Sequence, residues 1–566
     1  MFKLENLLRN EYFPSELPPC FNSNSFADNH ENIKTLVESI KLSPSDPLTF
    51  SGYKNSNSRR KFSIPNPVHY ANAANIIVNN SNAIFDIINK SEHSVTAPLD
   101  KTPDKNECYK KKAYSYKDLK DRIKKLYTCN RYEIRLDIQS FFDSVYTHSI
   151  AWAIHTKDVA KKNKKNQEFL GNKLDASLQI MNSGQTNGIL TGNAISRIAS
   201  EIILSTVDTL IHNKYPKINF LRYVDDYFIF VKEPTLMDDI TSFVRQELAK
   251  YSLYLNENKI NFNSSPFVYG KSWVEEMRVY SCLQPELLIE KAIIEYHKYE
   301  DISILRYALQ VIRGICFNKK KWNEIQPIIL NILVSFPNLS DIITIILKNN
   351  AEYVKLSVLK QCIYTILDNN VKLKNDEEVI WAVWLCKIFN IKLSLNYIIK
   401  VLDTDNWVAI IILLDIISKK KNELPVKKAT DKFRRRIIEE YFDNNNDGMN
   451  TDIWLLAYEC EKNKWLNTSG VDIFDKAHKN QYFKKLKELN IDFYKSDYEY
   501  VDIANPEYKS NIYVTRKELM VLLEEYKKLN DNITDNDAKN STKIIVKNDI
   551  FEKIKEALRN NDSFIY

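Results

Sequence analysis

The chain has 566 residues, of which 44% are hydrophobic and 27% charged, and its formal net charge is +7. This composition excludes disordered and fibrous proteins, and the length predicts at least two domains at roughly 100 to 200 residues per domain. The excess of 80 Lys and Arg over 73 Asp and Glu is too small for a histone-like nucleic-acid binder.

The cysteine pattern and the hydropathy of the sequence indicate the cellular compartment of the protein. The eight cysteines form no CxxC pair and have no histidines at zinc-finger spacing, which argues against structural zinc and against a disulfide framework. Residues 1–13 mix charged and apolar residues and lack the apolar region of a signal peptide. The longest apolar run, residues 407–414, is too short to cross a bilayer. We therefore expect a cytoplasmic protein with no membrane role.

The first half of the chain predicts mixed secondary structure. Residues 131–137 and 220–231 are rich in β-branched and aromatic residues that nearly alternate with polar ones, which predicts strands. Residues 196–210 and 237–251 carry apolar side chains at helical spacing. The sequence therefore predicts an α+β domain over residues 1–275.

From about residue 285 the pattern becomes helical. Apolar residues between Ile325 and Phe336 recur every three or four positions, and similar stripes begin near residues 305, 359, 379 and 412. These stripes predict an all-α domain over residues 285–530, built as a HEAT-like helical repeat. Because no repeated consensus is present, an irregular helical domain is the alternative. Residues 531–566 are predicted to form a polar linker and a terminal helix.

The most specific chemical signal is a pair of adjacent carboxylates. Asp225 and Asp226 lie in the sequence YVDD, which is predicted to be a turn between two strands, and Asp137 ends the earlier predicted strand. Neighbouring carboxylates repel one another, so bringing them together needs a cation. Mg²⁺, or Mn²⁺ in its place, suits three carboxylates, and two such ions would stabilise an attacking 3′ oxygen and a leaving pyrophosphate. The pattern predicts phosphoryl transfer.

Two further segments fit this chemistry. Residues 187–193 form a loop bracketed by Gly188 and Gly192, with Thr191 inside it, directly before a predicted helix. Such a loop can lie against a base and sugar and offer backbone amides to phosphate. Downstream, Lys259 in LYLNENK is placed to assist the pyrophosphate as it departs.

These motifs together resemble a known superfamily. LDIQSFF, GILTGNAISR, RYVDD and LYLNENK are similar, in this order, to motifs A to D of the reverse-transcriptase palm, and the resemblance covers about residues 10–265. More narrowly, NEYFPSELPPCFNS, SRRKFSIPNP at 58–67, YTHSI at 146–150 and a helical C-terminal half in place of a thumb resemble the bacterial abortive-infection and defence-associated reverse transcriptases, most of all the AbiK type. The expected fold is therefore a reverse-transcriptase fingers-palm domain followed by the helical domain.

The resemblance assigns roles to individual residues. The metal-binding catalytic acids would be Asp137, Asp225 and Asp226, with the backbone carbonyl of Ile138 as a further metal ligand. Phe142 stands at the position of an aromatic steric gate that clashes with a 2′-hydroxyl and favours deoxynucleotides.

Other expected nucleotide contacts lie in the finger motif and in motif B. The expected triphosphate ligands in the finger motif are Arg59, Arg60 and Lys61. Motif B departs from the family pattern, because Leu190 and Thr191 stand where Pro and Gln are usual, and this puts conventional handling of the template strand in doubt.

The AbiK type implies more than a polymerase. Its members are associated with DNA synthesis that needs no template and is primed from a tyrosine of the protein, with trimeric or hexameric assembly, and with antiphage defence by abortive infection. The expected substrates are dNTPs, and the expected product is single-stranded DNA attached covalently to the protein. Tyr12 aligns with the priming region, although its residue pattern alone favours a buried or interface aromatic.

Alternatives remain open at this stage. The chain could be a reverse transcriptase that copies a dedicated, bound non-coding RNA, or a catalytically silent scaffold or sensor that binds RNA. The residues from Arg59 to Lys61 could be a solvated charge cluster, and Phe142 a core aromatic.

Overall fold

A computed structural model of the chain describes residues 1–55, 58–111, 116–267, 273–274, 276–277, 285–418, 423–442, 448–466 and 481–500. The predicted linker and terminal helix at 531–566 lie outside these residues, and so does most of the predicted boundary at 275–285. The chain forms two compact units. One comprises residues 1–114, 121–267 and 363–498, and the other takes in residues 268–362 and the start of helix α6 (Tyr116–Tyr127). The predicted division into domains at 1–275, 285–530 and 531–566 stays a prediction.

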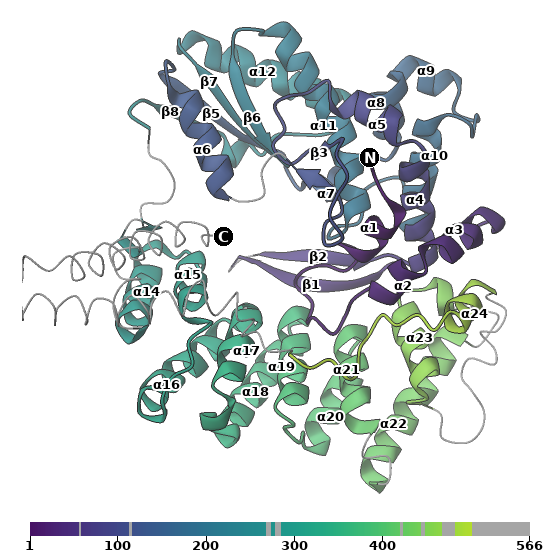
Figure 1. Cartoon of the computed structure of the whole chain (residues 1–566), viewed down its shortest axis with the longest axis vertical. Helices are drawn as coiled ribbons and strands as arrows, with labels where there is room; N and C mark the ends of the chain where they lie inside the picture. The colour runs from purple at the N-terminus through teal and green to yellow at the C-terminus, as the bar shows by residue number, and fades with distance from the viewer. Residues whose placement is uncertain are drawn as a thin grey trace, which may run out of the picture. The chain divides into compact units, whose positions relative to one another are not determined.

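A four-stranded antiparallel sheet lies in the first unit (Figure 1). Its strands, in the spatial order β6-β7-β5-β8, are Asn219–Tyr223, Asp226–Val231, Tyr132–Asp137 and Asn261–Ser264. The predicted strands at 131–137 and 220–231 are confirmed, and the second is a hairpin of two strands. Tyr227 and Ile229 of β7 are fully buried and alternate with the half-buried Asp226 and Phe228, as residues on opposite faces of a strand should.

Two smaller strand pairs complete the β structure that the model describes. A hairpin is formed by β1 (Leu48–Asn55) and β2 (Ser58–Ile64), which pair antiparallel from Leu48 opposite Ile64. The strands β3 (Pro98–Leu99) and β4 (Lys110–Lys111) form the other pair.

Helices surround these strands in the first half of the chain. The predicted helices at 196–210 and 237–251 are confirmed as α11 and α12, which contact each other. Asn193 caps α11, because its side-chain oxygen accepts the Ser196 amide at 3.0 Å. The helices are α1 (Leu4–Arg9), α2 (Asn24–Asp28), α3 (His30–Ser39), α4 (Pro67–Asn79), α5 (Ser81–Ile88), α6 (Tyr116–Tyr127), α7 (Phe141–Ser144), α8 (His148–His155), α9 (Lys157–Lys162), α10 (Leu170–Met181), α11 (Ala194–Lys214), α12 (Thr235–Lys250) and the 3-10 turn η1 (Glu257–Lys259).

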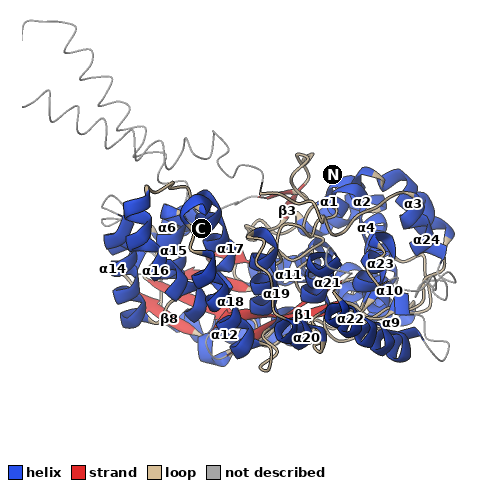
Figure 2. Ribbon diagram, turned by 90° about the horizontal axis from the view of Figure 1, so that it is seen from below, coloured by secondary structure: helices blue, strands red, loops and turns tan. Residues whose placement is uncertain are grey.

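From residue 285 on, every regular element in the described part of the chain is helical (Figures 1 and 2). This confirms a helical C-terminal region, whereas its organisation as a repeat stays a prediction. The elements are α14 (Pro285–Tyr299), α15 (Ser303–Ile312), α16 (Lys319–Ser335), η2 (Pro337–Leu339), α17 (Ser340–Asn349), η3 (Ala351–Tyr353), α18 (Leu356–Asn370), α19 (Asp376–Ile388), α20 (Leu395–Leu402), α21 (Trp407–Ser418), α22 (Leu424–Ile437), η4 (Ile438–Phe442), η5 (Gly448–Asn450), α23 (Trp454–Asn463) and α24 (Gln481–Glu488).

Residues from the two ends of the described chain share one aromatic core. The ring of Phe493 packs against those of Tyr12, Phe13 and Phe26, with ring centroids 5.5 to 6.2 Å apart. The backbone is joined there as well, because the Asn22 amide donates to the Phe493 carbonyl at 3.1 Å. The late helical segment is therefore part of the same core as the N-terminal segment.

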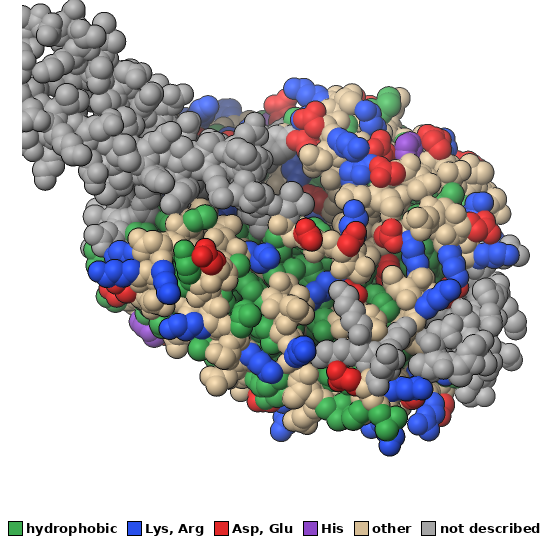
Figure 3. Space-filling view, turned by 60° about the horizontal axis from the view of Figure 1, so that its bottom comes forward, with side chains coloured by type: hydrophobic (Ala, Val, Ile, Leu, Met, Phe, Trp, Pro, Cys, Tyr) green, Lys and Arg blue, Asp and Glu red, His purple; other side chains and the backbone are tan. Residues whose placement is uncertain are grey.

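The described helices and one face of the surface bear on the predicted absence of a membrane role. In the described part of the chain, no single helix is long and apolar enough to cross a membrane, and one pair, Lys319–Ser335 with Pro337–Asn349, passes that test only together while bent by 118°. On the face shown in Figure 3, Lys and Arg side chains are interspersed with Asp and Glu side chains rather than joined in one basic patch.

Candidate active site

The three predicted catalytic carboxylates meet at one end of the four-stranded sheet. Asp226 is the first residue of β7 and lies opposite Asp137, the last residue of β5, in the register of these strands. Asp225 occupies the two-residue turn between β6 and β7. The structure thus brings Asp137 together with the adjacent pair Asp225 and Asp226, which lies far from it in the sequence.

The turn that carries Asp225 has an unusual backbone conformation. The φ angle of Val224 is +54°, and Asp225 is not among the residues with positive φ. Glycine usually fills the first central position of such a hairpin turn, and a β-branched residue in the left-handed region costs about 1–3 kcal/mol. Two hydrogen bonds hold Val224 in place: Arg222 Nη1 donates to its carbonyl oxygen at 2.9 Å, and its amide donates to Thr96 Oγ1 at 3.3 Å.

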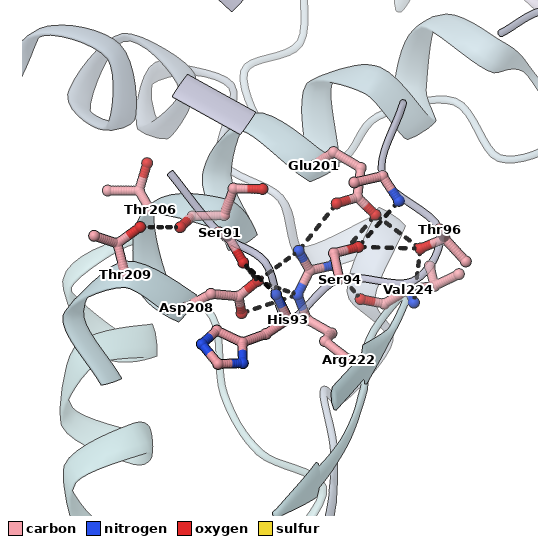
Figure 4. Close-up of polar contacts among 12 residues, drawn as sticks. Ser91, His93, Ser94, Thr96, Glu201, Thr206, Asp208, Thr209, Arg222 and Val224 are labelled. Carbon is pink, nitrogen blue, oxygen red and sulfur yellow. Dashed lines mark hydrogen bonds and ion pairs between the residues drawn. The ribbon is translucent and has the colours of Figure 1, made fainter. Parts of the chain in front are cut away.

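Behind the turn lies a buried network centred on Arg222 (Figure 4). The guanidinium is fully buried, with Nη2 2.9 Å from a carboxylate oxygen of Glu201 and 2.9 Å from one of Asp208, both on α11. Burial alone would lower the pKa of Arg222, but the two carboxylates outweigh it and raise that pKa well above its ordinary value. Ser91 and Thr96 donate hydroxyl hydrogen bonds to Asp208 and Glu201 at 2.8 and 2.9 Å.

Sequence analysis missed this network, although two signals were present. Arg222 follows Leu221 inside a predicted strand that is otherwise apolar on its inner side. Glu201 and Asp208 are seven residues apart and therefore on one face of the predicted helix at 196–210. An arginine in a buried strand, together with two acids on one face of a helix, indicates a buried cluster of ion pairs.

The two carboxylates of the hairpin turn, Asp225 and Asp226, resist ionisation. Burial, followed by the charges of Asp225 and Asp137, raises the pKa of Asp226 to about 7. Burial raises the pKa of Asp225 as well, with a further contribution from Asp137, while Lys259 and Arg60 oppose the rise. A bound cation would favour the ionised forms, so the electrostatics fit the expected metal site.

Two side chains of the segment after α12 face Asp137. Lys259 Nζ lies 2.9 Å from Asp137 Oδ1, and Asn256 Nδ2 lies 3.2 Å from Asp137 Oδ2. In this arrangement, no three His, Cys, Asp or Glu side chains of the described residues converge closely enough to hold one ion. The donor set fits a hard divalent cation, which would compete with Lys259 for Asp137.

The backbone around Ile138 is compatible with its expected role. Ile138 pairs with Leu255 in an isolated antiparallel bridge. The flanking hydrogen bonds run from the Gln139 amide to the Tyr254 carbonyl and from the Asn256 amide to the Asp137 carbonyl. Neither uses the carbonyl of Ile138, and metal ligation by that carbonyl stays a prediction.

Phe142 lies beside the glycine-bracketed loop. It belongs to the short helix α7, is half-buried, and its carbonyl accepts the Ile189 amide at 2.9 Å. Gly188 has a φ of +84°, and a Cβ there would lie 3.3 Å from the Asp143 carbonyl. The loop therefore packs closely against the segment that follows Asp137. A steric-gate role for Phe142 stays a prediction.

The other end of the loop contacts the β1–β2 hairpin. The Thr191 carbonyl accepts the Ser63 amide at 3.1 Å. Gly192 has a φ of +107°, and a Cβ there would lie 2.8 Å from Pro14 Cγ and 3.3 Å from the ring of Phe62. Only glycine fits this position without displacing a neighbour.

The three basic residues of β2 have different surroundings. Arg59 forms two hydrogen bonds to the carboxylate of Glu378, at 2.5 and 2.6 Å, so its guanidinium is engaged by the helical region. Arg60 and Lys61 are exposed. The positive charge of Arg60 acts to lower the pKa of Asp225, so Arg60 influences the carboxylates electrostatically. Arg60 and Lys61 are therefore better candidates for binding a triphosphate than Arg59.

Tyr12 is placed in the core rather than at the carboxylates. Its side chain is fully buried, and its hydroxyl donates to the Pro65 carbonyl at 2.6 Å. Burial raises the pKa of this phenol well above its ordinary value, which makes it a poor nucleophile. This burial argues against Tyr12 as the primer and for a core aromatic, and priming from Tyr12 stays a prediction.

The comparison with known proteins found a family match for part of the chain. Residues 80–281 match the family model described as reverse transcriptase (RNA-dependent DNA polymerase), and this stretch contains Asp137, Asp225, Asp226 and Lys259. No curated protein matches the chain.

Solved structures that resemble the chain include telomerases of two yeasts. The Candida albicans telomerase, in complex with a fragment of telomeric RNA, has 11% identity and a TM-score of 0.29, with coverage of 62% of this chain and 65% of that one. The apo telomerase of Candida tropicalis has 12% identity, a TM-score of 0.31, and coverage of 63% and 73%. Its C-terminally truncated form has 13% identity, a TM-score of 0.29, and coverage of 43% and 55%. The chain spans less than two thirds of the first and third of these structures.

Proposed function

We propose that this chain is an active enzyme that polymerises dNTPs. Its residues 80–281 match the reverse transcriptases, the RNA-directed DNA polymerase family of nucleotidyltransferases. The observation that carries the proposal is the convergence of Asp137, Asp225 and Asp226 at one end of the sheet, with raised pKa values for the last two. Clustered acids that resist ionisation are characteristic of catalytic metal sites.

The surrounding side chains would bind and orient the substrate. Divalent cations, which this family of polymerases generally uses, would supply electrostatic stabilisation of the attacking and leaving oxygens. Arg60 would bind the triphosphate, since it is exposed on β2 and its charge acts on Asp225, and Lys61, which is also exposed on β2, is a further candidate. Lys259, once released from Asp137, would be within reach of the leaving pyrophosphate. Phe142 would exclude the ribonucleotide 2′-hydroxyl.

A paired substitution tests this proposal. Replacing Asp225→Ala together with Asp226→Ala should abolish incorporation of labelled dNTPs in Mg²⁺ or Mn²⁺, measured with and without a template-primer. The control is Asp238→Asn, which changes an exposed acid in the first turn of α12 and should leave incorporation unchanged. Incorporation that persists in the double variant would refute the assignment of the site.

We extend the proposal to antiphage defence by abortive infection, with synthesis that needs no template and is primed from a tyrosine. The support is the resemblance of the finger, YTHSI and palm segments to the AbiK type. Because Tyr12 is buried, the primer would be another of the 32 tyrosines. The product would then be single-stranded DNA joined to the protein, in a cytoplasmic trimer or hexamer.

One assay separates these possibilities. The purified protein is incubated with each labelled dNTP without template, and the products are resolved on a denaturing gel before and after protease treatment. Label that leaves the protein only on proteolysis supports self-priming, and mass spectrometry of the labelled peptide identifies the tyrosine. Incorporation that requires a co-purified RNA would instead support copying of a non-coding RNA. Full protection against phage by the double aspartate variant would favour a catalytically silent scaffold.

A further inference from the structure

The first turn of α19 carries three successive carboxylates, Asp376, Glu377 and Glu378, which we name the acidic turn. It belongs to the same compact unit as the β1–β2 hairpin and contacts it directly. The acidic turn lies outside the stretch that matches the reverse-transcriptase family, and so does the hairpin. Its contacts are therefore not explained by the palm.

Each carboxylate of the acidic turn binds a different group of the hairpin. Asp376 Oδ2 accepts the Ser51 amide at 2.8 Å, and Glu377 Oε2 accepts the Tyr53 amide at 2.7 Å. These amides alternate along β1, on the edge that faces away from β2. An edge strand whose amides are bound in this way is fixed in position.

The third contact is a two-point ion pair. Arg59 of β2 donates from Nη1 and Nη2 to the two oxygens of Glu378, and Nη2 also donates to the Ser51 carbonyl at 3.0 Å. The Glu378 side chain is only 5% exposed, so water screens this pair weakly. Two parallel charge-assisted bonds fix orientation as well as distance.

Close packing supports the same arrangement. A Cβ on Gly52, between the two bound amides, would lie 2.4 Å from the Phe62 ring and 3.1 Å from Glu377 Oε2. A larger residue at this position would therefore clash with the Phe62 ring within the hairpin and crowd the carboxylate of Glu377.

The hairpin in turn reaches the active site. Phe62 and Ser63 of β2 contact the Thr191–Gly192 loop, and the charge of Arg60, next to Arg59, acts on Asp225. Adjacent residues of a strand point to opposite faces. Fixing Arg59 on one face therefore fixes Arg60 on the other.

We propose that the acidic turn of α19 anchors the β1–β2 hairpin over the active site, so that the helical region sets the affinity of the enzyme for dNTPs. Arg59 is then a positioning residue that acts through Arg60, rather than a ligand of the triphosphate. This inference rests on the proposed polymerase function.

Steady-state kinetics of incorporation test the anchor. Glu378→Gln should raise KM for dNTP roughly ten-fold or more, as expected for loss of a charge-assisted pair, while kcat at saturating dNTP changes little. Arg59→Lys, which keeps the charge and loses the two-point geometry, should raise KM less. The charge exchange of Arg59→Glu with Glu378→Arg should recover most of the wild-type KM. Asp368→Asn, which breaks an ion pair with Lys400 elsewhere in the helical region, is the control and should leave KM unchanged.

The possible results are distinct. An unchanged KM in both Glu378→Gln and Arg59→Lys would overturn the anchor. A lowered KM in Glu378→Gln would also overturn it, because Glu378 would then be competing with the triphosphate for Arg59. If the wild-type protein incorporates no dNTP under any condition, the proposed function itself fails, and hydrogen exchange at Ser51 and Tyr53 would still report whether the acidic turn holds the hairpin.

Discussion

The buried arginine behind the catalytic turn makes the sharpest prediction. Replacing Arg222→Met keeps an unbranched side chain of similar length and removes the only charge that Glu201 and Asp208 share in the network of Figure 4. It also removes the donor to the Val224 carbonyl. The substitution should therefore affect both folding and catalysis.

The two effects have separate magnitudes. Breaking a buried ion pair by removing one partner costs about 3–5 kcal/mol, because charged groups are left uncompensated in the interior. Val224 would also lose one of the two bonds that hold its strained conformation, which itself costs about 1–3 kcal/mol. A displacement of Asp225 by about 1 Å would reduce incorporation roughly 100-fold.

A compensating variant separates the two effects. Combining Arg222→Met with Glu201→Gln and Asp208→Asn removes the buried charges, so most of the lost stability should return, measured as the midpoint of urea or thermal denaturation. Activity should stay low, because the Val224 carbonyl still lacks its donor. As a control, Arg245→Met breaks an exposed pair with Glu257 and should change stability by less than about 1 kcal/mol. A wild-type midpoint for Arg222→Met, or recovered activity in the triple variant, would refute this reasoning.

Three further predictions concern single side chains. The folded-state pKa of Asp226 is raised to about 7, so the folded protein keeps a proton that the unfolded chain loses above about pH 4. The free energy of unfolding of the metal-free protein should therefore fall by up to ~4 kcal/mol as pH rises from about 4 to 7. Thermal denaturation at a series of pH values measures this fall, and Asp226→Asn or added Mg²⁺ should reduce it. Tyr12→Phe should lower the free energy of unfolding by about 0.5–1.5 kcal/mol, because the hydrogen bond to Pro65 is lost. The amount of labelled nucleotide linked to the protein on gels should stay unchanged. Loss of this label without loss of stability would indicate that Tyr12 is the primer. Phe142→Ala should admit ribonucleotides, measured as a higher ratio of kcat/KM for rNTP to kcat/KM for dNTP. An unchanged ratio would contradict the assignment of Phe142 as a steric gate.

Local patterns predicted the part of the site that depends on local structure. The alternation around Asp137 and Asp226 predicted the strands, and the adjacency of Asp225 and Asp226 predicted the turn, because strand period and turn chemistry are short-range properties. The glycines at 188 and 192 likewise marked positive φ angles.

Long-range contacts could not be predicted in this way. Arg59 was expected to bind a triphosphate, but its partner Glu378 is 319 residues away, and a single sequence contains no signal for that pairing. The burial of Tyr12 depends on Phe493 for the same reason. The composition change near residue 280 marked where the helices begin, whereas the compact units depend on which of those helices return to the first half.

The shared aromatic core has a consequence for protein synthesis. Tyr12 and Phe13 emerge first from the ribosome, yet Phe493, which completes their packing, is translated last among the residues of that core. At roughly 5–20 residues per second, the interval is about 25 seconds or longer. During this time the catalytic turn is present in a chain whose N-terminal core is open. Translation products that end before Phe493 should therefore lack polymerase activity.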